Sequence, residues 1–305
     1  MINTRLITLS MAGLMMMMAD TARAAEPYTQ HENIVYAETD GIGLVMDIFV
    51  PTGEKNGLAI VDVVSGAWHS DRSKIEQHKM AQMYRIFCSR GYTVFGVRPG
   101  SISKFTAPQM VDHVQRGIRW VKEHAGEYEV DPERLGMTGA SAGGHLACLT
   151  AVKSEDGDTS VKSVAVFFPP TDLVTYVKNK MEGPSTGSKK EVPIATRLSA
   201  LCFDRFKSDT STEELLEALA EISPALHVTG KEPPFLLIHG DADELVPLEQ
   251  SEIMVAALKD HDVPVELVIK PGGGHPWPTI YEEVGVIADW MDKQLITGTT
   301  AAVGN

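Results

Sequence analysis

The chain has too few basic residues for a typical nucleic-acid-binding protein. Its 305 residues include 27 lysines and arginines against 41 aspartates and glutamates, which gives a formal net charge of -14. A surface that follows a phosphate backbone needs a local excess of positive charge, so this balance argues against a nucleic-acid partner. The hydrophobic fraction of 43% and the charged fraction of 22% are ordinary for a soluble globular protein.

Cysteine is also scarce. Cys88, Cys148 and Cys202 do not form the even, closely spaced set of a disulfide-rich domain. Cys88 and Cys148 lie in apolar helical patterns and are expected to be small buried hydrophobic residues, although one disulfide stays open as an alternative. No CxxC pair or Cys/His cluster has zinc-binding spacing, so the sequence predicts no metal site and no cofactor.

No long apolar run follows the first 24 residues, so the sequence predicts no membrane anchor beyond them. The N-terminus has the three parts of a secretory signal peptide. Arg5 supplies the positive start, an apolar stretch rich in methionine follows, and Ala22-Arg23-Ala24 is a small-x-small cleavage site. We therefore predict a signal peptide at 1–24 and a secreted or periplasmic domain over 25–305.

Strand-like and helix-like patterns alternate from residue 33 onward. Segments 33–38 and 43–51 are expected to form an antiparallel pair, and the later strands are short apolar runs typical of strands buried on both faces. These later strands are predicted at 58–64, 92–98, 134–139, 161–170, 233–241 and 263–272. Helical periodicity falls at 74–92, 106–125, 142–152, 211–222, 251–261 and 280–295. The alternation predicts an α/β fold, with a mostly parallel sheet flanked by helices.

One segment interrupts this alternation. Residues 174–225 are polar, with glycine, serine and lysine near 183–190 and one predicted helix at 211–222. A long insertion in a compact domain is often a lid or a binding loop, so a small cap over the site is one interpretation. The other interpretation is a surface loop that lies away from the site.

The motif Gly139-Ala140-Ser141-Ala142-Gly143 lies where a predicted strand runs into a predicted helix. A G-x-S-x-G turn at that place forces the serine into strained backbone geometry and projects its hydroxyl above the sheet, whereas side chains at the two glycines would strike the neighbouring strand and helix. Ser141 is therefore a candidate nucleophile. A purely structural turn is the alternative.

A serine nucleophile needs a histidine base oriented by a carboxylate. His275 follows a predicted strand and three glycines, which allow its loop to bend toward Ser141. Two of the other nine histidines also lie near strand ends. His145 is one turn beyond Ser141 on the same helix and is poorly placed to face the hydroxyl, whereas His239 is expected to support the acid loop. His275 is the predicted base.

Three carboxylates compete to be the acid that orients this base. Asp241, Asp243 and Glu244 follow the strand at 233–241, and the spacing to the following Val-Pro pair favours Asp243, with Asp241 second. The chain order Ser, Asp, His is the one found in hydrolases with this type of turn. Holding a turn together is the alternative function of these acids.

An oxyanion hole needs preorganised N–H donors. The backbone N–H of Ala142, directly after the nucleophile, is one expected donor. The second is expected in the loop after strand 58–64, where Gly66 and Ala67 are both small enough to let the backbone approach a substrate. Trp68 in the same loop either forms a substrate wall or caps the core.

These residues resemble the α/β-hydrolase superfamily and, within it, the BD-FAE-like set of feruloyl and acetylxylan esterases. The resemblance covers about residues 40–295 and is carried by "VMDIFVP", "VSGAW", "WVKEHAGEYEVDPERLGMTGASAGGHLA", "PPFLLIHGDADELVP" and "GGGHPW". It implies Ser141 as nucleophile, Asp243 as acid, His275 as base, and ester hydrolysis through an acyl-enzyme. Such enzymes usually have His-Gly-Gly-Gly or His-Gly-Gly in the oxyanion loop, and "VVSGAW" departs from that pattern.

The leading hypothesis is therefore a secreted serine carboxylesterase without a cofactor, acting on short acyl esters or on acetyl or feruloyl esters of a polysaccharide. One alternative is a prolyl-oligopeptidase-type peptidase or amidase with the same residues. Another is a non-catalytic binding protein with a hydrolase fold. The sequence does not indicate an oligomeric state.

Overall fold

The computed structural model describes residues 26–154, 157–182, 194–203 and 211–296. An eight-stranded sheet runs through them in the order β1-β2-β4-β3-β5-β6-β7-β8. The strands are β1 Tyr28–Thr39, β2 Ile42–Pro51, β3 Ala59–Val63, β4 Thr93–Val97, β5 Leu135–Ala140, β6 Ser163–Phe167, β7 Phe235–Gly240 and β8 Val265–Lys270. The β1/β2 and β2/β4 pairs are antiparallel, and all other neighbouring pairs are parallel. The predicted antiparallel start and the mostly parallel sheet are confirmed.

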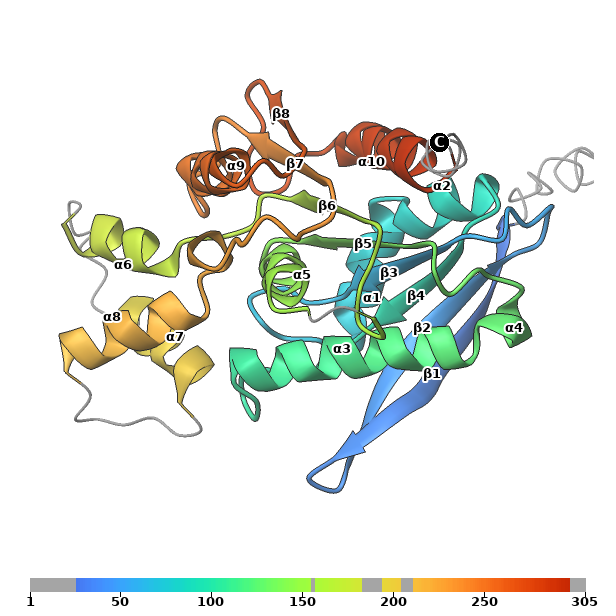
Figure 1. Cartoon of the computed structure of the whole chain (residues 1–305), viewed down its shortest axis with the longest axis horizontal. Helices are drawn as coiled ribbons and strands as arrows, with labels where there is room; N and C mark the ends of the chain where they lie inside the picture. Colours follow the sequence, from blue (N-terminus) through green and yellow to red (C-terminus); the bar gives the residue numbers. More distant parts are fainter. Residues whose placement is uncertain (1–25, 155–156, 183–193, 204–210, 297–305) are drawn as a thin grey trace, which may run out of the picture.

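Helices cover both faces of this sheet (Figure 1). On one face α3, α5 and α9 contribute to a large apolar cluster, and on the other face α1, α2 and α10 contribute to a second one. The helices outside the insertion are α1 Arg72–Met80, α2 Met83–Ser89, α3 Ala107–Glu123, α4 Ala125–Tyr128, α5 Ala142–Val152, α9 Glu249–Asp260 and α10 Ile280–Leu295. The predicted α/β architecture is therefore correct.

Local sequence signals explain where α3 begins. Thr106 accepts the backbone N–H of Gln109, and the Gln109 side chain accepts the N–H of Thr106, which forms a capping box. The apolar stripe of this helix is buried against the sheet, as its 3.6-residue spacing predicts. Its members are Val111, Val114, Ile118 and Val121.

The single helix predicted over 74–92 is wrong, because the structure divides this segment into α1 and α2. The break lies at Gln82, whose φ of 58° is in the left-handed region that no helix interior adopts. After the break, α2 turns a different face toward β2 and β4, so that Tyr84 stacks on Phe49 with ring centroids 3.6 Å apart. No glycine or proline marks this break in the sequence.

The insertion at 174–225 is mainly helical in its described part. It contains α6 Leu173–Glu182, α7 Ile194–Cys202, α8 Thr212–Glu221 and the short 3-10 helix η2 Pro224–Leu226. These helices gather beyond one edge of the helical layer that contains α5 (Figure 1). Leu201 of α7 and Leu219 of α8 are fully buried in the large apolar cluster, which ties the insertion to the main domain.

All three cysteines are free thiols, and Cys88 and Cys148 are buried as predicted. The predicted signal peptide at 1–24 lies outside the described residues. Within the part of the chain that the structure describes, no helix has the length and apolar character needed to cross a membrane.

Candidate active site

The site lies at the carboxyl ends of the parallel strands. Because β3, β5, β7 and β8 run in the same direction, the loops that follow them emerge at one edge of the sheet. Residues 65–68 follow β3, Ser141 follows β5, Asp243 follows β7 and His275 follows β8. The topology therefore collects every residue of the predicted site, although these residues lie far apart along the chain.

Ser141 occupies a sharp turn between β5 and α5. Its φ of 54° and ψ of -120° are strained for a residue with a side chain, and its N–H donates to the carbonyl of Phe167 at 3.0 Å. A Cβ at Gly139 would lie 2.6 Å from the carbonyl group of Gly143, and a Cβ at Gly143 would overlap the carbonyl oxygen of Val63. Close approach of strand and helix therefore requires both glycines, as predicted.

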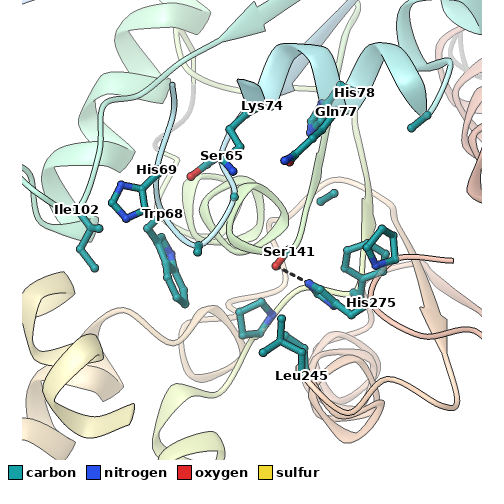
Figure 2. A pocket seen from close by; sticks show the side chains of 18 of the residues that line it. Ser65, Trp68, His69, Lys74, Gln77, His78, Ile102, Ser141, Leu245 and His275 are labelled. Atoms are coloured by element: carbon teal, nitrogen blue, oxygen red, sulfur yellow. Dashed lines mark hydrogen bonds between the residues drawn. The ribbon is translucent and has the colours of Figure 1, made fainter. Parts of the chain in front are cut away.

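The loop that carries His275 approaches the end of β7 very closely. A Cβ at Gly240 would overlap the carbonyl of Gly273, and that carbonyl accepts the N–H of Ala242 at 3.0 Å. Glycine on both sides of this contact lets the two loops pack backbone against backbone. This packing directs His275 back across the sheet edge toward Ser141 (Figure 2).

Ser141, His275 and Asp243 form a continuous chain of hydrogen bonds. His275 Nε2 lies 2.9 Å from Ser141 Oγ, and His275 Nδ1 lies 2.6 Å from Asp243 Oδ2. A carboxylate only accepts, so Nδ1 carries the proton and donates it to Asp243, which leaves the Nε2 lone pair facing the serine hydroxyl. The three residues that the sequence placed together thus form one hydrogen-bonded chain.

Asp243 is held as a carboxylate by the hydrogen bonds around it. Burial by itself would raise its pKa, but the neighbouring imidazoles of His239 and His275 and the hydrogen bond from the Val246 N–H hold the pKa well below its usual range. Its Oδ1 accepts the N–H groups of Leu245 and Val246, each at 2.9 Å. A carboxylate fixed in this way keeps the imidazole of His275 in one orientation and one tautomer.

The other two acids of this loop lie elsewhere. Asp241 accepts the N–H of Gly272 at 2.6 Å, so its carboxylate joins the β7 and β8 loops and does not contact His275. Glu244 is exposed. Of the three carboxylates that the sequence left in competition, the structure brings only Asp243 to the histidine.

Two aromatic side chains support the histidine and its acid. His239 is fully buried; its Nε2 donates to the carbonyl of Val246 at 2.8 Å and lies 3.5 Å from Asp243 Oδ2. Phe168, which the sequence analysis missed, packs on His275 with ring centroids 4.3 Å apart. Its φ of 34° is unusual for a bulky residue. Its place directly after β6, at the same sheet edge, was the available signal.

His145 connects three parts of the site. Its Nδ1 accepts the indole N–H of Trp68 at 3.1 Å, and its Nε2 donates to the carbonyl of Ile222 at 2.8 Å. Burial lowers the pKa of His145 to about 4, although the Ile222 carbonyl raises it slightly. The neutral imidazole therefore joins the loop after β3, the helix of the nucleophile and the end of the insertion. It does not contact Ser141 through its side chain.

The loop after β3 has the geometry of an oxyanion loop. Gly66 donates its N–H to the carbonyl of His69 at 2.9 Å, so this hydrogen bond favours Ala67 of the two alternatives that the sequence left open. Ala67 is exposed and has a φ of 48°, and no hydrogen bond among the described residues occupies its N–H. Ala142 begins α5 directly after Ser141. Ala67 and Ala142 are therefore the two candidate donors.

A cavity of about 950 Å³ opens above Ser141. The sheet-edge loops line it with Ala67, Trp68 and His275, and the insertion lines it with Tyr176 and Leu198. The insertion thus forms part of the cavity wall, and Trp68 both lines the cavity and packs on the core. Within residues 26–154, 157–182, 194–203 and 211–296, no three His, Cys, Asp or Glu side chains are grouped so that they could hold a metal ion.

The chain is similar to known proteins in sequence and in fold. "Probable carboxylic ester hydrolase LipM" of Mycobacterium tuberculosis is 25% identical over 209 residues, which are 66% of this chain and 44% of that protein. This chain thus spans less than half the length of LipM. A solved "Truncated form of carbohydrate esterase from gut microbiota" superposes with a TM-score of 0.72 at 23% identity, over 90% of this chain and 99% of that one.

A second solved structure is the "acetyl ester-xyloside bifunctional hydrolase from Caldicellulosiruptor lactoaceticus". It has a TM-score of 0.65 at 21% identity and covers 86% of this chain and 95% of its own. These likenesses show that the fold is that of α/β-hydrolases. The BD-FAE family model matches residues 46–258, which contain Ser141 and Asp243. The chain therefore belongs to the BD-FAE family.

Proposed function

We propose that this protein is a serine carboxylic-ester hydrolase that acts through an acyl-enzyme. The observation that carries the proposal is the hydrogen-bonded chain Ser141–His275–Asp243 above a cavity large enough for a small ester. Membership of the BD-FAE family and similarity to a carboxylic ester hydrolase support it. The nucleophile, base and acid are the residues that the sequence singled out.

In the first half of the reaction His275 acts as general base. Its Nε2 takes the proton of Ser141 Oγ while that oxygen attacks the ester carbonyl, and the carbonyl oxygen becomes an oxyanion. The N–H groups of Ala67 and Ala142 stabilise this negative charge because they are already oriented in the folded protein. Asp243 stabilises the imidazolium that forms. His275 then returns the proton to the leaving alkoxide, which departs as an alcohol.

In the second half water replaces the alcohol. His275 Nε2 removes a proton from the water as it attacks the acyl carbonyl, and a second tetrahedral oxyanion forms at the same donors. When this intermediate collapses, Ser141 Oγ leaves and takes the proton back from His275. A carboxylic acid is released and the free enzyme is restored.

We propose that the substrates are short acyl esters, including acetyl or feruloyl esters of a polysaccharide. One structural neighbour is described as a carbohydrate esterase and another as an acetyl ester-xyloside hydrolase, which supports a sugar-linked ester. The cavity is lined mainly by apolar side chains, which suits an acyl or aromatic group. Hydrolysis of acetylated xylan and feruloylated sugars, compared with 4-nitrophenyl esters of increasing chain length, tests this assignment.

The central test compares the parent protein with Ser141→Ala. We expect the parent to hydrolyse 4-nitrophenyl acetate and to react covalently with a fluorophosphonate probe at Ser141. We expect the variant to lose both properties while its circular dichroism spectrum stays that of the parent. A folded Ser141→Ala protein that retained the parent rate would contradict the assignment.

The same experiment separates the alternative functions. A folded parent protein that fails to react with the fluorophosphonate would indicate a non-catalytic protein. Faster cleavage of a proline amide than of the matched ester would indicate a peptidase or amidase.

We further propose that the protein is exported and that residues 1–24 are removed. N-terminal sequencing of the protein secreted by a Gram-negative host should then begin at Ala25.

A further inference from the structure

One wall of the cavity is cationic although the chain as a whole is acidic. Lys74 and His78 project from α1 on the side of the cavity opposite Leu245 and His275 (Figure 2). No aspartate or glutamate is among the described residues that line the cavity. In a chain with 41 acidic and 27 basic residues, a lining that contains a lysine and no carboxylate is a marked local reversal of charge.

Lys74 lies directly over the oxyanion loop. A Cβ at Gly66 would be 3.1 Å from Lys74 Cδ and 3.5 Å from Lys74 Nζ, so the aliphatic stem covers this glycine and the ammonium group is beside it. Arg72 and Lys79, on the same helix, pair with the carboxylates of Asp47 and Glu76 at 2.9 and 3.6 Å. No ion pair or side-chain hydrogen bond among the described residues involves Lys74 Nζ.

The acid that caps α1 does not neutralise this lysine by direct contact. Asp71 caps the helix, where its Oδ1 accepts the N–H of Ser73 at 2.9 Å, and it does not line the cavity. The charge of Lys74 lowers the pKa of Asp71, after the larger effect of the hydrogen bond from Ser73. The ammonium group thus faces the cavity with its hydrogen-bonding capacity unused.

His78 is fixed by a buried carboxylate behind it. Its Nδ1 donates to Asp62 Oδ2 at 2.7 Å, and Tyr84 donates to the same oxygen at 3.0 Å. Asp62 is fully buried, and its other oxygen has no partner among the described residues. Burial lowers the pKa of His78, but the charge and hydrogen bond of Asp62 outweigh it and raise the pKa. Because Nδ1 donates to Asp62, Nε2 donates toward the cavity only in the imidazolium form, which the Asp62 carboxylate favours.

We propose that Lys74 and His78 form a subsite for a carboxylate group of the substrate, so that the preferred esters carry a negative charge close to the scissile carbonyl. This inference rests on the proposed ester hydrolase function and adds the substrate class. Two donors on one helix face, one beside the oxyanion loop and one backed by a buried acid, match a carboxylate with its two acceptor oxygens. The remaining apolar lining would contact the uncharged part of the ester.

The test uses two pairs of substrates, each a carboxylate and the methyl ester that removes its charge. In the first pair the carboxylate is on the leaving group: 4-acetoxybenzoate against its methyl ester. In the second pair it is on the acyl group: 4-nitrophenyl hydrogen glutarate against its methyl ester, with the Ser141→Ala rate subtracted as background. The readout is the ratio of kcat/KM for the charged ester to that for its neutral methyl ester, which cancels general losses of activity.

We expect the parent to prefer the charged ester in at least one pair. Lys74→Met keeps the apolar stem over Gly66 and removes the charge, so we expect the ratio to fall about tenfold. The double variant Asp62→Asn/His78→Gln removes both buried charges together and is also expected to lower the ratio. Lys79→Met, on the same helix but outside the cavity lining, is the control and should leave the ratio unchanged.

The pair that responds identifies which side of the ester carries the carboxylate. Equal kcat/KM for charged and neutral esters in both pairs would overturn the subsite, as would a ratio that Lys74→Met leaves unchanged. Failure of the proposed function is distinguishable, because the parent would then hydrolyse neither the charged nor the neutral esters.

Discussion

The indole N–H of Trp68 donates to Nδ1 of His145 at 3.1 Å across 77 positions of the chain. This bond attaches the loop after β3 to the helix that begins at the nucleophile. The other ring nitrogen of His145 donates to the carbonyl of Ile222, so one buried imidazole also holds the end of the insertion. The site therefore depends on a neutral histidine that takes no direct part in the proposed reaction.

This arrangement predicts a specific acid sensitivity. The pKa of His145 is about 4 in the folded protein, against about 6.5 in an unfolded chain. Between these values the unfolded chain binds a proton that the folded protein does not. The contribution of His145 is thus complete above pH 6.5, and about 3 kcal/mol of the free energy of unfolding is lost as the pH falls toward 4.

Urea unfolding of the parent and of His145→Gln at pH 7.0 and pH 4.5 measures this effect. The glutamine keeps a donor for Ile222 but does not titrate, so the free energy of unfolding should fall less in the variant between the two pH values. An identical fall in both proteins would show that His145 does not titrate in this range.

Asp243 and Asp241 provide a matched pair within one loop. Asp243→Asn should lower kcat roughly ten-thousandfold, because an amide at this position no longer fixes the Nδ1–H tautomer of His275. Asp241→Asn should lower kcat only a few fold, because its side chain bonds to a backbone N–H two residues after β8. Steady-state kinetics with 4-nitrophenyl acetate distinguish the two. Equal losses would show that the loop, and not the carboxylate at 243, controls activity.

Two glycines in helices should respond in opposite directions to substitution by alanine. A Cβ at Gly143 would overlap the carbonyl of Val63, so Gly143→Ala should lower both the midpoint of thermal unfolding and the activity. A Cβ added at Gly285, within α10, would meet no atom within 4 Å, so Gly285→Ala should raise the free energy of unfolding by about 1 kcal/mol through helix propensity. Thermal melts of both variants check the prediction, and a neutral Gly143→Ala would disprove the close contact.

The three thiols should be unreactive in the native protein. Burial raises the pKa of Cys88 and of Cys202 to about 12, and it raises the pKa of Cys148 further, so little thiolate forms near pH 8. A thiol reagent such as dithionitrobenzoate should therefore react slowly with folded protein and should titrate three groups in guanidinium chloride. A titre of one group after unfolding without reductant would reveal a disulfide.

Much of the site was accessible from local patterns. Ser141 lies in a motif whose glycines have a steric reason, and His275 follows three glycines at a strand end. The strands and most helices follow from apolar periodicity and caps such as Thr106. The break at Gln82 was not predictable in this way, because no glycine or proline marks the left-handed residue.

Other assignments depended on contacts between distant segments. The carboxylates of Asp241 and Asp243 are two positions apart; the spacing favours Asp243 but leaves Asp241 as an alternative, and the structure shows that only Asp243 meets His275. Gly66 and Ala67 are equivalent in sequence, and only the bond from the Gly66 N–H to His69 separates them. Phe168 and His145 were not assigned to the support of the site, because the ring contact of Phe168 and the hydrogen bonds of His145 join residues far apart along the chain.

The sequence by itself determined the alternating strands and helices, the strained turn at Ser141 and the histidine that could serve it, because these follow from backbone sterics and from periodic burial along a short segment. Only the tertiary structure decided which acid meets that histidine, which N–H groups stay unbonded and which charges face the cavity. Each of these contacts joins atoms from different strands or helices. The interaction energy depends on the distance between the atoms and on their burial, and neither can be read from a single segment of sequence.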